Sequence, residues 1–223
     1  YSTTDYITVP STFTKNSLVN NGVNKDKIVN IPLGVNTDNF EYTDSPDEFT
    51  VLFFGGAPIR KGLIYLLEAW NELRLENANL IVKTGSYDKY KTVYKKYIEN
   101  NDNIELISGY MENITKLYER SSVLVLPSLQ DGFGMVVLEA MASGLPVVVS
   151  ENTGSKDIIN DGENGYIVPI RDKESIKDKI KYLYDNPDVS SVLGNNAKKT
   201  AEKYSWDRYG RKMMEAYHKC IDY

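Results

Sequence analysis

Two acidic residues stand eight positions apart in one stretch of this chain, on either side of a glycine turn. The stretch runs from Leu126 to Ser150 and reads LPSLQDGFGMVVLEAMASGLPVVVS, with Asp131 before the glycines and Glu139 after them. A β-rich run precedes the turn and a helical pattern follows it. The first turn of a helix carries backbone N–H groups that have no partner within the helix, and such groups bind phosphate. The stretch therefore predicts a phosphate site with a carboxylate on each side.

The glycines and the helix geometry support this interpretation. Gly132 and Gly134 allow a tight turn and a close approach of the backbone to a ligand. Glu139 lies more than one turn into the helix, but helical side chains lean toward the N-terminus, so we expect its carboxylate at the rim of the site. Carboxylates accept hydrogen bonds from sugar hydroxyls. The pattern suits a nucleotide sugar, with ribose on one side of the diphosphate and the transferable sugar on the other.

Two cations precede a second helix in the segment GGAPIRKG, which runs from Gly55 to Gly62. A helix dipole contributes only about 0.3 to 1 kcal/mol, which is too little to neutralise a departing diphosphate. Charge-assisted hydrogen bonds add roughly 1.5 to 3 kcal/mol each. We therefore expect Arg60 and Lys61 to contact the diphosphate, although the sequence also allows an exposed pair that opens a helix.

Strand-like and helix-like segments alternate along the chain, and the fold that they form must position the acids and cations described above. Each apolar run is followed by a helical pattern: TVLFFGG then 61–74, ANLIVKTG then 87–100, IELISGY then 112–121, SVLVLPS then 134–143, LPVVVS then 155–160, and GYIVP then 172–186. Runs that are apolar throughout predict strands buried on both faces, as in a parallel sheet covered by helices. We predict a Rossmann-like, doubly wound α/β domain over residues 49–203.

The two ends of the chain fall outside this domain. Within residues 1–48, YITVPSTFTKNSLVNNG predicts one extra strand and helix, and KIVNIPLGVNTDNF predicts a strand that leads into a linker. Residues 204–223 predict a helix with Trp206, Met213, Tyr217 and Cys220 or Ile221 near one face. The simplest interpretation of that apolar face is packing.

Composition argues against several other classes of protein. The 223 residues carry a net charge of -5 with acids and bases interspersed, which does not suit a nucleic-acid surface. One cysteine and one histidine, Cys220 and His218, make neither a disulfide framework nor a metal centre, and we take both as structural. No run of about 18 apolar residues appears, and the stretch YSTTDYITVPS lacks the charged and apolar regions of a signal peptide, so we expect a cytoplasmic protein.

Together these segments resemble the retaining, nucleotide-sugar-dependent glycosyltransferases of family 4, whose GT-B fold consists of two facing Rossmann-like domains. DGFGMVVLE resembles the E-x7-E hallmark of that family, and PSLQDGFGMVVLEAMASGLPVVVSENTGSKDIINDGENGYIVP follows its pattern closely. KIVNIPLGVNTDNF resembles its interdomain linker, and YSWDRYGRKMMEAY its C-terminal helix. The resemblance implies the C-terminal, donor-binding half of such an enzyme. Residues 1–48 would then be a remnant of the acceptor domain plus the linker, and residues 204–223 would pack back toward the missing domain.

The resemblance also implies roles for individual residues. Glu139 would bind the donor ribose, Asp131 the donor sugar, and Arg60 and Lys61 the diphosphate, and these four form the expected catalytic set. Further donor contacts would come from Phe133, Gly134, Met135, Val136, Gly55, Gly56, Gly85 and Tyr110. Asp131 is one methylene shorter than the usual glutamate, which leaves the sugar open. Many members carry an arginine where this chain has Gly56, so Arg60 would take over that contact.

Three of these interpretations have equal rivals in the sequence. Gly85 is equally well an ordinary turn glycine. Tyr110 could line the pocket for the base or could pack in the core or on the surface. The loop from Asn152 to Ser155 either contacts the donor or caps the next helix through Ser155.

The resulting hypothesis is a hexosyltransferase that moves a sugar from a nucleoside diphosphate sugar to a hydroxyl with retention. We expect no cofactor and no metal, because no D-x-D pair follows a strand. The acceptor, a glycan or a lipid-linked sugar, would bind through the missing domain, so this half alone should be inactive; the whole enzyme could associate peripherally with a membrane.

One alternative is a GT-B-like module that binds a nucleotide or sugar without catalysis. A dinucleotide-dependent oxidoreductase is disfavoured because FFGGAPIRKG lacks G-x-G-x-x-G.

Overall fold

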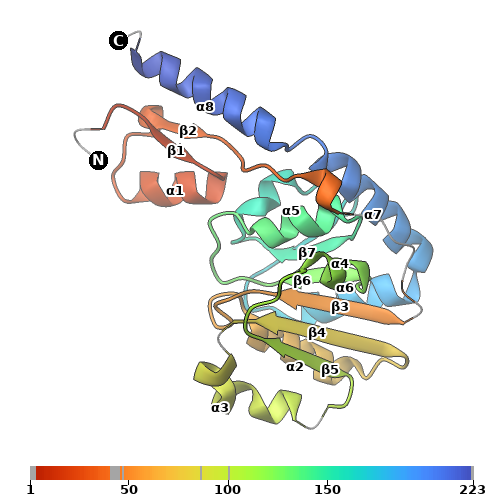
Figure 1. Cartoon of the computed structure of the whole chain (residues 1–223). Coiled ribbons are helices and arrows are strands. Elements are labelled where there is room, and N and C mark those ends of the chain that lie inside the picture. The colour runs from red at the N-terminus through yellow and green to blue at the C-terminus, as the bar shows by residue number, and fades with distance from the viewer. Residues whose placement is uncertain (1–3, 41–45, 47, 86, 100, 222–223) are drawn as a thin grey trace.

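The computed structural model describes residues 4–40, 46, 48–85, 87–99 and 101–221, and its main feature is a six-stranded sheet (Figure 1). Every neighbouring pair of strands is parallel. The spatial order is β5-β4-β3-β6-β7-β8. In chain order the strands are β3 (Phe49–Phe54), β4 (Ala78–Thr84), β5 (Ile104–Ser108), β6 (Val123–Leu126), β7 (Val147–Ser150) and β8 (Tyr166–Val168). The predicted parallel sheet is confirmed.

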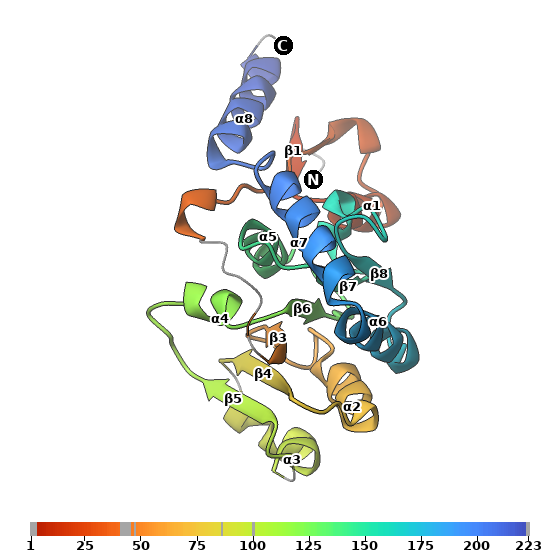
Figure 2. The same ribbon diagram turned by 90° about the vertical axis from the view of Figure 1, so that its right-hand side faces the viewer.

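Helices cover both faces of this sheet. Helices α4 and α5 lie on one face and α2 and α6 on the other, with α7 beside α5 (Figure 2). The helices are α2 (Leu63–Leu73), α3 (Tyr87–Ile98), α4 (Thr115–Glu119), α5 (Met135–Ala142), α6 (Lys173–Asp185), α7 (Pro187–Ala201) and α8 (Trp206–Ile221), with the 3-10 helix η3 (Gly154–Ile158). This is the expected Rossmann-like α/β fold, in which α7 is an additional helix that the sequence analysis did not separate.

The core lies between the sheet and its helices. Strands β6 and β7 are buried at every residue, as their uninterrupted apolar runs predict. Helix α2 buries one face through Leu63, Leu66, Leu67 and Trp70, which recur at three- and four-residue steps. Burying each of these side chains contributes about 1.5 to 3 kcal/mol. The core therefore fixes the positions of the strand ends that bear the site.

A small N-terminal segment lies beside the main sheet. Strands β1 (Ile7–Val9) and β2 (Ile28–Asn30) form a separate two-stranded parallel sheet, connected through α1 (Thr12–Asn20) and the 3-10 helix η1 (Lys25–Lys27). A second 3-10 helix, η2 (Thr37–Asn39), follows β2. Helix α1 contacts η3, and β2 lies next to α8 (Figure 1). The predicted extra strand and helix and the following strand are confirmed.

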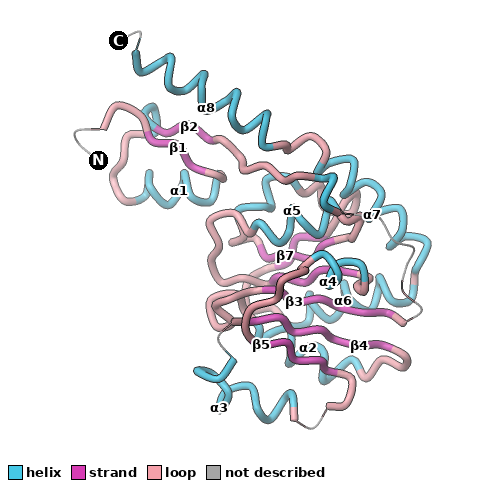
Figure 3. Tube along the Cα trace, viewed as in Figure 1, coloured by secondary structure: helices cyan, strands magenta, loops and turns pink. Residues whose placement is uncertain are grey.

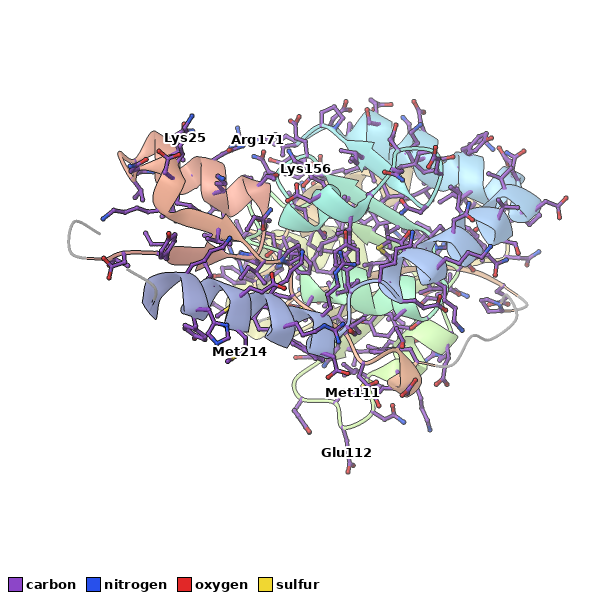
Figure 4. The ribbon with its side chains drawn as sticks, turned by 90° about the horizontal axis from the view of Figure 1, so that it is seen from above. Lys25, Met111, Glu112, Lys156, Arg171 and Met214 are labelled. Atoms are coloured by element: carbon purple, nitrogen blue, oxygen red, sulfur yellow. The ribbon has the colours of Figure 1, made fainter. Side chains whose placement is uncertain are left out.

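The C-terminal helix differs from its prediction in what its apolar face contacts. Trp206 is 48% and Tyr217 54% exposed, so these two side chains do not pack in a core. Met213 is half-buried, and the side chains of Cys220 and Ile221 lie outside the described part of the chain. Met214 also points outward (Figure 4). Along the described helices, none combines the length and the apolar composition needed to cross a membrane.

The start of α2 yields a testable prediction about stability. Gly62 precedes α2 with φ +72°, and a Cβ atom there would lie 1.9 Å from the carbonyl oxygen of Pro127. We expect Gly62→Ala to lower the free energy of unfolding by about 3 kcal/mol, because left-handed strain and steric overlap add together. Urea unfolding measures the loss. Gly162→Ala is the matched control: its φ is +79° with nothing within 4 Å of the added Cβ, so it should cost only about 1 kcal/mol. Equal losses would contradict the overlap.

Candidate functional site

The predicted site residues gather where the strands end. Because the sheet is parallel, the carboxyl ends of its strands share one edge, and ligands of open α/β sheets bind beyond that edge. Figure 3 shows the loops that follow the strands gathered there, with α1 above them. Arg60 and Lys61 lie in the loop after β3, and Asp131 in the loop after β6. Topology alone brings these two loops together, since β3 pairs with β6.

The N-terminus of α5 combines features that suit an anion. Gly134 is the N-cap with φ +81° and no side chain to cap the helix. A Cβ atom at Gly134 would lie 3.0 Å from Oδ2 of Asp131 and 3.2 Å from Cγ2 of Thr153, so the tight packing also requires glycine. Within the described residues, no hydrogen bond is made by the backbone N–H groups of Phe133 or Gly134. These free donors, together with the helix dipole, favour phosphate.

Backbone N–H groups of the segment after β7 hold the carbonyl groups of this turn. The N–H of Gly154 donates to the carbonyl of Asp131 at 2.9 Å, and the N–H of Ser155 donates to that of Phe133 at 2.7 Å. A trans peptide points its N–H away from its carbonyl, so each anchored carbonyl also fixes the next N–H. Ser155 therefore supports the turn rather than capping a helix: η3 begins at Gly154, and its N-cap is Thr153. Of the two interpretations of this loop, the one in which Ser155 caps the next helix is wrong.

Lys61 and Asp131 form an ion pair across the two loops. Nζ of Lys61 contacts Oδ2 of Asp131, and the two side chains are only 11% and 10% exposed. Gly55 makes room for the lysine, because a Cβ atom at Gly55 would lie 2.8 Å from Cγ of Lys61. A buried ion of this kind is costly to leave without its partner. The structure thus joins the cation expected at the diphosphate to the acid expected at the sugar.

Arg60 is more exposed and holds the loops together through the backbone. Its Nη1 donates to the carbonyl of Gln130 at 3.0 Å, and its own carbonyl accepts from the N–H of Leu129 at 2.9 Å. The alternative of an exposed cationic pair therefore fits Arg60 in part and does not fit Lys61. Gly56 is exposed beside this loop, and a Cβ atom there would meet nothing within 4 Å.

Glu139 has a partner that the sequence analysis missed. The hydroxyl of Tyr118, in α4, donates to Oε2 of Glu139 at 2.6 Å. Tyr118 is buried and packs edge-on against Phe40 and at a tilt against Phe54. Burial raises the pKa of Glu139, and the hydrogen bond from Tyr118 opposes that rise. Burial, followed by the charge of Glu139, raises the pKa of Tyr118 well above its usual range. In a chain rich in tyrosine, the sequence offered no signal for this pair.

The two acids therefore lie in different surroundings near one strand end. Asp131 is paired with Lys61, which packs on Gly55, whereas Glu139 is bonded to Tyr118, which packs on Phe54. Phe54 and Gly55 are the end of β3 and the residue that follows it. The carboxylates are thus linked through different partners to adjacent residues at the β3 terminus, and no contact joins them within the described residues.

The loops after β4 and β5 form the far part of the same edge. Lys83, near the end of β4, is buried, and its Nζ donates to the carbonyl of Gly109. A lysine inside the apolar run ANLIVKT was a signal that the sequence analysis did not use. Tyr110 is 92% exposed, so its alternative assignment to the core is wrong. Gly85 is exposed with open space at its Cβ position, which leaves both of its interpretations open.

The remaining predicted donor residues follow the α5 turn. Phe133 is buried, while Met135 and Val136, in the first turn of α5, are half-buried. Across the part of the chain that the structure describes, no three residues among histidine, cysteine, aspartate and glutamate lie close enough to hold a metal ion.

Known proteins share this sequence pattern and this fold. The family model described as glycosyl transferases group 1 matches residues 35–200. An uncharacterised glycosyltransferase of Methanocaldococcus jannaschii is 31% identical over 226 residues, which cover all of this chain and 62% of that protein. The chain thus spans less than two thirds of that relative's length.

Two solved structures have the same fold. A glycosyltransferase from Rickettsia africae superposes with a TM-score of 0.88 at 22% identity, over 97% of this chain and 64% of that one. The HepE protein of Anabaena, solved in complex with UDP-glucose, superposes with a TM-score of 0.86 at 16% identity, over 96% of this chain and 64% of that one. At these identities the likeness concerns the fold.

The half-buried carboxyl of Glu139 predicts a pH dependence of stability. Because burial raises its pKa, the folded chain holds this proton to higher pH than the unfolded chain does. The stability that the neutral carboxyl contributes is complete below its ordinary value of 4.5 and is lost as the pH rises through the folded-state pKa. We expect Glu139→Gln to gain free energy of unfolding relative to the unaltered chain as the pH rises from 4 to 7, as measured by urea unfolding.

A second variant tests the cause of that dependence. Tyr118→Phe removes the hydrogen bond that lowers the pKa of Glu139, so the loss of stability with rising pH should become larger. If the unaltered chain, Glu139→Gln and Tyr118→Phe share one pH profile, the surroundings of Glu139 do not raise its pKa.

Proposed function

The chain belongs to the group 1 glycosyl transferases, and on that premise we propose that it binds a nucleoside diphosphate sugar as the donor for transfer to an acceptor hydroxyl. One observation carries the proposal. The free N–H groups at the N-terminus of α5 lie at the same sheet edge as Lys61 and Arg60, in the loops after β6 and β3. A diphosphate fits that combination of donors and cations.

The cations and the helix terminus would act on the leaving group. In the transfer, the bond between the sugar C1 and the phosphate oxygen breaks, and the oxygen keeps the electron pair. The acceptor oxygen forms the new bond to C1 and loses its proton to the departing phosphate oxygen or to water. Negative charge therefore develops on the diphosphate, where preorganised N–H donors and a lysine stabilise it. Nζ of Lys61 contacts Asp131, and an ammonium group has three N–H donors, so it could serve a phosphate as well.

The two carboxylates would orient the donor by accepting hydrogen bonds from hydroxyls. Asp131 uses Oδ2 for Lys61, and its Oδ1 has no partner within the described residues. Glu139 uses Oε2 for Tyr118, and its Oε1 is likewise without a partner there. We assign the transferred sugar to Asp131 and the ribose to Glu139. Fixing each carboxylate through one oxygen leaves the other available to accept a hydrogen bond from a hydroxyl.

Several finer points are part of the same proposal. The transfer retains the anomeric configuration and moves a hexose, and Arg60 and Lys61 rather than a divalent metal stabilise the diphosphate. Residues 1–48 belong to the acceptor domain and the linker, residues 49–203 form the donor domain, and residues 204–223 return toward the acceptor domain. The acceptor, a glycan or a lipid-linked sugar, binds outside this chain, and this chain alone does not catalyse transfer. The location is cytoplasmic, with the whole enzyme at a membrane face.

The first prediction of this proposal concerns nucleotide binding. A nucleoside diphosphate at about 100 times its Kd should add about 2.7 kcal/mol of stability, which raises the Tm by about 5 to 10 °C for a chain of this size. A thermal-shift screen of UDP, GDP, ADP and UDP-glucose measures it. We expect Glu139→Ala to reduce the shift, and Glu202→Ala, at an exposed glutamate after α7, to leave it unchanged. A screen in which no nucleotide raises the Tm would refute the proposal.

The second prediction separates the sugar from the diphosphate. Asp131→Asn keeps the size of the side chain and removes a negative charge beside the proposed phosphate site. We expect UDP to bind at least as tightly as before, and the gain in affinity from UDP to UDP-glucose to fall about fivefold, because a hydrogen bond to a charged acceptor is weakened. Isothermal titration calorimetry gives both Kd values. An unchanged ratio would place the sugar away from Asp131.

A further inference from the structure

A serine of the N-terminal segment reaches into the back of the α5 turn. Ser11, just before α1, is completely buried, and its hydroxyl donates to the carbonyl of Gly132 at 2.5 Å. The hydroxyl of Thr14, in the first turn of α1, donates to the same carbonyl at 3.2 Å. Ser11 and Gly132 are 121 positions apart in the chain. The carbonyl of Gly132 is therefore held by two hydroxyls from outside the six-stranded sheet and its helices.

This anchor has a consequence on the opposite side of the peptide. The peptide between Gly132 and Phe133 is trans, so its N–H points away from the anchored carbonyl. That N–H, which belongs to Phe133, is one of the free donors at the N-terminus of α5. The next carbonyl, of Phe133, is held by Ser155, which belongs to the main domain. Of these two consecutive peptides, one is thus oriented from within the domain and the other by the N-terminal segment.

The surrounding residues are shaped to admit Ser11. A Cβ atom on Gly154 would lie 2.5 Å from Oγ of Ser11 and 2.7 Å from its Cβ, so glycine is required for the serine to enter. Beside it, the N–H of Thr12 donates to Oδ2 of Asp157 at 2.6 Å and its hydroxyl to Oδ1 at 2.5 Å. Helix α1 has no fully buried residue, so polar contacts dominate its docking on η3. Docking of α1 and the shape of the turn are thereby linked.

We propose that Ser11 and Thr14 are positioning residues of the donor site, which aim the N–H of Phe133 at the phosphate by holding the carbonyl of Gly132. The inference rests on the proposed function, since it concerns the same diphosphate. Coupling between two sites is reciprocal. Nucleotide binding therefore also strengthens the docking of α1, just as docking of α1 strengthens nucleotide binding.

A purely structural role for Ser11 makes a different prediction. Ser11 is the N-cap of α1 and accepts a hydrogen bond from the N–H of Thr14 at 3.1 Å. Losing a cap lowers stability without changing nucleotide affinity. Asn24 provides the matched control, because it caps η1 in the same N-terminal segment through the N–H of Asp26 and makes no contact with Gly132.

The test measures nucleotide affinity in matched variants. Calorimetric titration with UDP, GDP and ADP should show affinity about tenfold weaker in Ser11→Ala and several-fold weaker in Thr14→Val, which keeps the shape and loses the hydroxyl. Thr14→Ser should restore affinity, and Asn24→Ala should lower the Tm with affinity unchanged. Should Ser11→Ala fail to fold, the comparison of Thr14→Val with Thr14→Ser decides the question alone.

A second readout tests the reciprocal effect and needs no catalysis. Hydrogen exchange of the α1 amides should slow when UDP is added to the unaltered chain, and the slowing should be reduced in Thr14→Val. Unchanged affinity in both Ser11→Ala and Thr14→Val, with nucleotide bound normally by the unaltered chain, overturns this inference and leaves the proposed function intact. An unaltered chain that binds none of the three nucleotides overturns both proposals.

Discussion

Parallel pairing of the six strands is the constraint on which the rest of this structure depends. It collects every loop that leaves a strand at one edge of the sheet and points the following helices back across its faces. Two loops from neighbouring strands, after β3 and after β6, then meet over that edge. The loop after β3 supplies cations and the loop after β6 leads into a helix N-terminus. The two meet in space although they are 70 positions apart in the sequence.

Close packing then restricts which residues can stand at this edge of the sheet. Glycine occupies three positions where backbone approaches backbone or a charged side chain: Gly62 against Pro127, Gly55 against Lys61, and Gly134 against Asp131. The charged side chains at this edge also have partners. Lys61 is compensated by Asp131, and Glu139 is held by the hydroxyl of Tyr118 while burial raises its pKa. These local solutions leave the N–H groups of the α5 turn free, which is the property that suits an anion.

Much of the fold could be predicted because its signals are local. Uninterrupted apolar runs such as those of β6 and β7 indicate strands buried on both faces, and Gly144, with Pro146 two residues later, indicates that α5 ends just before it. Helix boundaries shifted by up to three residues, as with α4. The exposed face of α8 could not be predicted, since periodicity shows that a face is apolar and does not show what covers it.

The sequence by itself determined most of the secondary structure, the parallel sheet, and the identities of the acids, cations and glycines at the candidate site, because these depend on residue types and short spacings. Only the tertiary structure decided their partners. Whether Lys61 meets Asp131, whether Glu139 meets Tyr118, and whether Ser11 reaches Gly132 from 121 positions away all depend on distances across the fold. A hydrogen bond or ion pair requires a separation of about 3 to 4 Å, and no local pattern encodes which distant atoms come that close.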